Sequence, residues 1–130
     1  MYFLIYSSYA SSIFNQNELK ILLIQAREKN KKIGIGGMLL SVGRQFVQLL
    51  EGEEKEIKNL YNHICKDSRH KGVVLLKEGH LENPIFPDWS MGFKAVSPEE
   101  LEGVAGYKGL NAASALQVFI KLSEKKEELK

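Results

Sequence analysis

The sequence has 130 residues, of which 44% are hydrophobic and 26% charged, and its formal net charge is +2. This length suits one domain with a true core and is too short for two. So small a charge gives no support for a polyanion-binding surface, and nucleic acid is not expected as a partner. The one cysteine, Cys65, excludes an internal disulfide and any multi-cysteine metal site, as is typical of a cytoplasmic protein.

The amino terminus is apolar, but it lacks a basic start and is followed at once by polar Ser7 and Ser8. Aromatic and β-branched residues over 2–7 favour a strand rather than a signal peptide. No apolar run approaches the roughly 18 residues that a membrane helix needs. We therefore expect no membrane association.

Local patterns predict the elements of the first half. Asn15 and Glu18 have the spacing of a helix N-cap with a reciprocal acidic partner, and an apolar stripe follows up to Asn30. Glycines then give way to a continuous apolar run, and Gly43-Arg44 suggests a tight turn. The predicted elements are strands over 2–7, 33–42 and 44–52 and a helix over 15–30.

The second half contains weaker patterns. An apolar stripe that includes Ile57, Ile64 and Cys65 predicts a helix over 53–67, with Cys65 as inert packing. Asn111 can cap a last helix that reaches Ser123. The remaining predicted elements are short strands over 73–76 and 89–96.

The order βαββαββ predicts an α+β, ferredoxin-like sandwich: a five-stranded mixed sheet with two helices on one face and a C-terminal helix. Right-handed crossovers place the first and third strands side by side at the centre. We expect one domain over 1–96. The extension over 97–130, a linker and a helix, then packs on the open sheet face or on a partner.

Gln48 is the anomaly of the central strand, because it is enclosed by Phe46, Val47, Leu49 and Leu50. Each hydrogen-bonding site of a buried amide that stays empty costs about 1 to 3 kcal/mol. A backbone group or a neighbouring side chain can satisfy it, and so can a flat, hydrogen-bonding ligand. The predicted fold brings Tyr6 and Asn30 toward the same region.

Several segments together resemble the BLUF family of blue-light sensors using flavin, over about residues 1 to 96. The matching segments occur in the family's order and near its spacing: Leu4-Ile5-Tyr6-Ser7-Ser8, Asn30 before Gly34-Ile35, Phe46 to Gly52, Asp67-Ser68-Arg69-His70 and Trp89-Ser90-Met91. The resemblance implies a flavin, FAD or FMN, held without a covalent bond between the two helices.

The resemblance also implies a role for individual residues. Tyr6 is the photoactive tyrosine, which releases an electron and a proton, and Gln48 is the amide between it and the flavin. Trp89 and Met91 of the last strand relay the light signal to a partner protein. No metal or catalytic residue is implied. The implied flavin contacts are Tyr6, Leu22, Asn30, Phe46, Gln48, His63, Ile64 and Arg69.

Each of these residues also has an ordinary structural interpretation. Tyr6 can be a strand-end aromatic, and Asn30 can be a helix terminator in a left-handed conformation. Arg69 can pair with Asp67, and Trp89 and Met91 can be core residues. The sequence departs from the family at Ala26, Lys29 and Gly36, positions that bear on the tuning of the flavin ring and on the affinity for flavin.

Other functions suit the predicted fold. An RNA-binding module of this strand order needs exposed aromatics on two adjacent strands, and Val47 and Leu49 supply none. A light-insensitive flavin-binding relative is a second alternative. A small enzyme is a third, but we find no nucleophile with a paired base and no metal-ligand cluster. The glycines near Gly34 precede no helix, so a dinucleotide fingerprint is not supported.

Overall fold

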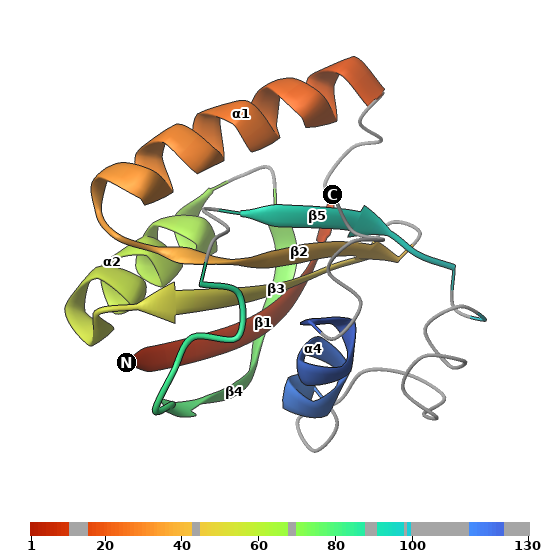
Figure 1. Ribbon diagram of the computed structural model, residues 1–130. Helices are drawn as coiled ribbons and strands as arrows, with labels where there is room; N and C mark the ends of the chain where they lie inside the picture. The colour runs from red at the N-terminus through yellow and green to blue at the C-terminus, as the bar shows by residue number, and fades with distance from the viewer. Residues whose placement is uncertain are drawn as a thin grey trace.

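The computed structural model describes residues 1–10, 16–42, 45–67, 70–87, 91–97, 99 and 115–123 (Figure 1). The element order confirms the predicted βαββαββ core with a C-terminal helix. The elements are β1 (Tyr2–Ala10), α1 (Gln16–Lys32), β2 (Gly36–Val42), β3 (Gln45–Gly52), α2 (Glu54–Lys66), β4 (His70–His80), β5 (Gly92–Ala95) and α4 (Ala115–Ser123).

The boundaries differ from the prediction mainly in the later strands. β4 has 11 residues, much longer than the predicted 73–76, and β5 begins at Gly92 rather than Trp89. β4 is an edge strand that pairs with β1 along its length, so it extends on both sides of the apolar run over 73–76. The predicted caps Asn15 and Asn111 and the turn at Gly43-Arg44 lie outside the described residues.

The sheet has the strand order β4-β1-β3-β2-β5, which confirms that the first and third strands are neighbours at the centre. β1 and β3 are antiparallel, whereas β5 pairs with β2 in parallel, so the sheet is mixed. The β1–β3 register places Tyr6 opposite Gln48. Residues paired across neighbouring strands share a face, so these two side chains lie side by side.

The two faces of the sheet are covered by different helices, with α1 and α2 on one face and α4 on the other (Figure 1). Alternate residues of β1 divide between them: Phe3 and Ile5 pack with Phe119 of α4, while Leu4 and Tyr6 pack with Ile57 of α2. The two-helix layer is thus confirmed, and the last helix lies on the sheet of its own chain. A domain boundary at residue 96 stays a prediction.

Two glycines between α1 and β3 lie where a side chain would strain or block the main chain. Gly34 has a φ of +70° where α1 ends, a conformation that favours glycine. Gly37 has a φ of +141°, and a Cβ atom added there would lie 1.9 Å from the carbonyl oxygen of Leu49. The glycines therefore end a helix and allow β2 to approach β3 closely.

The prediction for Cys65 is wrong, because its side chain is exposed rather than packed on the apolar stripe of α2. Ile57 is the buried member of that stripe, and Ile64 is half-buried. Among the described helices, none is long and apolar enough to cross a membrane.

Candidate functional site

A cavity of about 390 Å³ opens between α1, α2 and the sheet face that these helices cover. Its volume lies in the range of about 300 to 1,000 Å³ that is usual for small-molecule and cofactor sites. The lining is mostly apolar, with a few hydrogen-bonding groups among the aliphatic side chains. It consists of Tyr6, Leu22, Leu23, Gln25, Ala26, Lys29, Asn30, Ile33, Leu39, Phe46, Gln48, Leu60, His63, Ile64, Asp67 and Met91.

A tyrosine and a glutamine meet at the floor of this cavity. The Tyr6 hydroxyl donates a hydrogen bond to Oε1 of Gln48. Both side chains are buried, with exposed fractions of 1% and 9%. The bond joins the two central strands, so the same register that pairs β1 with β3 also positions the phenol and the amide.

The nitrogen end of the Gln48 amide has a weaker partner. Nε2 donates to the thioether sulfur of Met91 over 3.2 Å, and a thioether is only a weak acceptor. Among the described residues, no buried side-chain nitrogen or oxygen lacks a partner. The amide is thus satisfied by neighbouring side chains, firmly at its oxygen and weakly at its nitrogen, where a better acceptor can replace the sulfur.

The environment of Tyr6 keeps its phenol protonated. Burial is the main cause that raises the pKa of Tyr6, and Cys65, Tyr61 and Asp67 raise it further because a phenolate would be repelled by negative charge nearby. The rings of Tyr6 and Tyr61 are tilted, with centroids 5.7 Å apart. Tyr6 therefore has little tendency to lose a proton alone, and its proton has a defined acceptor in Gln48.

Asn30 reaches the cavity from the last turns of α1. Its carbonyl oxygen accepts hydrogen bonds from the amides of Ile33 and Ile35 at 3.2 and 2.8 Å, which closes the helix just beyond it. The left-handed position belongs to Gly34, and no described non-glycine residue has a positive φ. The interpretation of Asn30 as a left-handed terminator is therefore wrong. Its side chain is 4% exposed and lines the cavity.

The other predicted contacts within the described residues also line the cavity, namely Leu22, Phe46, His63 and Ile64. His63 is exposed at the rim, and its Nδ1 lies 2.8 Å from the Asn59 carbonyl oxygen. Arg69 and Trp89 lie outside the described residues.

Sequence reasoning did not assign several lining residues to the site. Leu39 is paired with Gln48 across β2 and β3, and Leu60 lies one turn before Ile64 on α2. Both follow from strand pairing and helical period once the neighbouring contact is known. Asp67, treated as a partner for Arg69, also reaches the cavity as the C-cap of α2.

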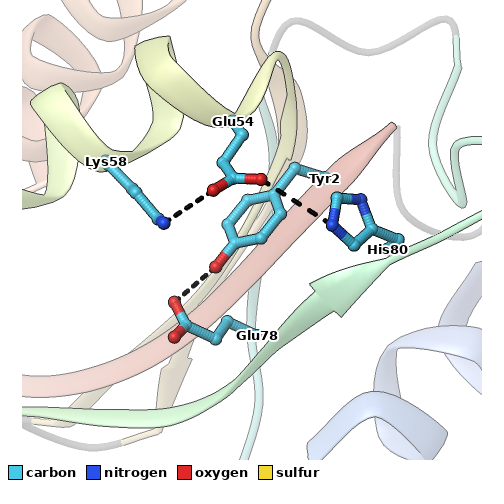
Figure 2. Close-up of polar contacts among 5 residues, drawn as sticks. All are labelled: Tyr2, Glu54, Lys58, Glu78 and His80. Carbon is cyan, nitrogen blue, oxygen red and sulfur yellow. Dashed lines mark hydrogen bonds and ion pairs between the residues drawn. The ribbon is translucent and has the colours of Figure 1, made fainter.

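A second tyrosine on the same face of β1 has different surroundings (Figure 2). The Tyr2 hydroxyl donates to Glu78 over 2.6 Å, and its ring packs edge-on against His80 with centroids 5.3 Å apart. Lys58 lies 5.4 Å from the Tyr2 ring centroid and pairs with Glu54 at 2.6 Å. Tyr2 thus contacts a cluster of surface charges, and it does not line the cavity.

The site defines a class of protein: a small α+β protein that accepts a cofactor-sized ligand between two helices, against a buried tyrosine–glutamine pair. The lining fits a flavin, because apolar walls suit a ring system and the amides of Gln48 and Asn30 can bind its polar edge. The family described as sensors of blue-light using FAD matches residues 1–92. The chain therefore belongs to the BLUF family, whose members sense blue light with a flavin.

Individual relatives agree with this assignment. The chain is 36% identical over 73 residues to the blue light- and temperature-regulated antirepressor BluF of Escherichia coli K12, which covers 56% of this chain and 18% of the relative. It is 33% identical over 89 residues to the photoactivated adenylate cyclase subunit beta of Euglena gracilis, which covers 68% of this chain and 10% of the relative. The chain thus spans less than a fifth of the length of these curated relatives.

Solved structures match over nearly the whole chain. The photo-activated state of BlsA superposes with a TM-score of 0.79 at 27% identity and covers 93% of this chain and 92% of its own. The dark state of BlrB, a BLUF protein, gives 0.76 at 27% identity and covers 98% and 95%. Klebsiella pneumoniae BlrP1 with FMN and cyclic diGMP gives 0.67 at 28% identity and covers 92% and 29%. A BLUF domain is itself a sensor and not a catalytic unit, and FAD is the flavin in the family's description.

Proposed function

We propose that this chain is a photoreceptor in which Tyr6 supplies an electron and a proton under blue light and Gln48 changes its hydrogen bonds in response. One observation carries the proposal. The Gln48 amide has a firm partner at its oxygen, the Tyr6 hydroxyl, and a weak one at its nitrogen, the Met91 sulfur. An amide held in this way can exchange partners at small cost.

The residues that would hold the flavin surround the cavity on three sides. Asn30 and Gln48 would bind the polar edge of the ring, and Leu22, Phe46 and Ile64 would contact its apolar surface. His63 at the rim would approach the flavin side chain, and Arg69 is assigned to the polar edge by resemblance alone. When bound, the flavin supplies a chromophore that absorbs blue light and becomes a strong oxidant. FMN is a second option besides FAD.

Tyr6 would release its electron and proton together. Burial raises the pKa of Tyr6, so its phenol is neutral before illumination. Once the electron leaves, the phenolic proton becomes strongly acidic and has an acceptor already in place at Oε1 of Gln48. The existing hydrogen bond is thus the route for the proton.

Gln48 would then return in a rotated or tautomeric form. In the rotated form the amide oxygen faces the Met91 sulfur, which then loses the N–H bond that it accepts here. In the tautomeric form Nε2 carries one hydrogen instead of two, so the contact with the sulfur is altered. Met91 directly precedes β5, which has four residues and pairs only with β2 among the described strands. A rearrangement at Gln48 would therefore act on a short edge strand, in a two-state manner.

The output would pass to another protein or through a change in assembly, in the cytoplasm. The larger relatives support a sensor that acts on separate output regions, since their names describe an antirepressor and adenylate cyclases. In this arrangement β5 and the segment after it would be the regions that a partner contacts.

Spectroscopy of the flavin-loaded protein tests the proposal. Tyr6→Phe should stay yellow and lose the light-induced red shift, because the ring remains while the donor hydroxyl is removed. Tyr2→Phe is the matched control, since it removes the other buried phenol of the same strand face and should leave the red shift intact. A normal photocycle in Tyr6→Phe would refute the role of Tyr6.

The same measurements separate the alternatives. A yellow wild-type protein with no light response would support a light-insensitive flavin-binding relative. A colourless protein that does not take up flavin would favour the RNA-binding module. Against that module, Phe46 and Val47 of the central strand are both buried, with exposed fractions of 8% and 0%.

A further inference from the structure

Met91 is held from two sides by side chains of different elements. Inside the cavity, Nε2 of Gln48 donates to its sulfur over 3.2 Å. On the other side, Nε of Arg27 donates to its carbonyl oxygen over 2.8 Å. The first bond reaches Met91 from β3 and the second from α1, so the residue before β5 joins three elements.

Arg27 stands outside the cavity. Its neighbours on α1, Ala26 and Asn30, line the cavity, whereas Arg27 does not, and its side chain is exposed. A hydrogen bond from a guanidinium to a carbonyl is charge-assisted, and the planar group fixes its direction as well as its length. Arg27 therefore holds the main chain of Met91 without touching the ligand site.

We propose that Arg27 is a positioning residue that fixes the main chain of Met91 so that its sulfur stays at the Gln48 amide. This inference rests on the proposed function for its kinetic consequence and for the direction in which the Met91 signal moves, but not for the change in that signal itself. The hydrogen bonds then form one path from the buried Tyr6 hydroxyl through Gln48 and Met91 to the surface of α1. The path makes α1 a second support for β5, in addition to its pairing with β2.

Loss of Arg27 should leave the fold intact, because the segment before Met91 has an anchor of its own. The carboxylate of Glu51 accepts hydrogen bonds from the amides of Ile85 and Phe86 at 2.5 and 2.9 Å. Phe86 is buried in the core on the α4 side. A variant at Arg27 thus releases the end of the segment at Met91 and leaves Phe86 in place.

Methionine-methyl NMR of the flavin-loaded protein tests the position of Met91 directly. The sequence has three methionines. Met1 is 49% exposed and Met38 is buried on the α4 side, so the Met91 signal can be assigned by elimination. In Arg27→Ala, the dark-state Met91 signal should move toward the position that it has in the illuminated wild type.

The kinetic consequence is slower dark recovery. The recovery of the flavin spectrum in Arg27→Ala should slow by roughly three- to tenfold, because one charge-assisted bond no longer favours the return. Lys31→Ala is the matched control, since it removes a nearby exposed cation of α1 that does not line the cavity. Should Arg27→Ala bind flavin too weakly, Arg27→Lys, which lacks the planar guanidinium, replaces it with the same expected direction.

An unmoved Met91 signal in the dark, or an equal change in Lys31→Ala, would overturn the role of Arg27. Faster recovery would contradict it as well. The proposed photochemistry fails separately, because that failure would appear as a wild-type protein without a light response. In that case the role of Arg27 is decided by the dark-state spectra alone: the Met91 signal should differ between Arg27→Ala and the wild type and stay unchanged in Lys31→Ala.

Discussion

The two faces of the sheet are built from the same strands, yet one is filled by the chain and the other leaves a cavity. On the α4 side, Ile5, Leu49 and Phe119 have exposed fractions of 0%, and aliphatic and aromatic residues fill the space between sheet and helix. On the other side, α1 and α2 leave about 390 Å³ beside Tyr6 and Gln48. A close-packed interior contributes most of the hydrophobic stabilisation. Packing on the α4 face therefore stabilises the sheet that carries the site on its opposite face.

The largest expected difference between the faces is in stability. Phe119→Ala should lower the free energy of unfolding by about 3 to 5 kcal/mol, because it leaves a void in a filled core. Ile64→Ala on the cavity side should cost about 1 kcal/mol or less, because Ile64 is only half-buried. Urea unfolding of the flavin-free proteins measures both values.

Flavin affinity should show the reverse order. Ile64→Ala should weaken flavin binding more than Phe119→Ala does, as measured by fluorescence titration under conditions where both variants are folded. Equal losses of stability, or a greater loss of affinity in Phe119→Ala, would mean that the two faces do not divide stability and binding between them.

Glu51 gives an intermediate effect, because it is a buried carboxylate on the mostly apolar α4 side. Glu51→Gln should lower the free energy of unfolding by about 1 to 3 kcal/mol, since an amide has one acceptor oxygen for the two backbone amides that the carboxylate now serves. Hydrogen exchange should increase at Ile85 and Phe86. Glu53→Gln, an exposed neighbour, should change neither quantity.

Alkaline pH should destabilise the protein, and Tyr6 on the cavity side should contribute to this loss. The pKa of Tyr6 is raised by burial above the ordinary value of about 10, so the unfolded chain loses this proton first. The stabilisation is fully present below about pH 10 and falls above it by up to about 1.4 kcal/mol per pH unit. Urea unfolding between about pH 9 and about pH 11 gives the free energy of unfolding at each pH. This free energy should fall less steeply with pH in Tyr6→Phe than in the wild type, and an equally steep fall would contradict the prediction.

The central part of the fold and site could be predicted from sequence because it depends on local patterns. Continuous apolar runs mark β1 and β3, and the handedness of crossovers makes them neighbours, which brings Tyr6 to Gln48. The position of Asn30 near this pair could be predicted because Asn30 lies at the end of an amphipathic helix. These inferences needed only the period of the sequence and one topological rule.

The missing parts depend on contacts between distant segments. The Arg27–Met91 bond joins residues 64 apart, and an arginine on a helix surface gives no sign of its partner. β4 carries charges such as Lys77 and Glu78 within its span, so its length follows from pairing with β1 and not from its own composition. The prediction for Cys65 is wrong because Cys65 follows Ile64, where the helical period already carries the side chain off the buried stripe.

The exposed Cys65 makes this chain ready for site-specific labelling without any prior mutation. It is the sole thiol in the sequence, and it lies on α2 next to the cavity-lining Ile64. A maleimide dye or nitroxide attached there would report on α2 while Tyr6, Gln48 and Met91 keep their own side chains. Helix movement could thus be recorded on the native background, with cysteine replacement needed only for a second probe.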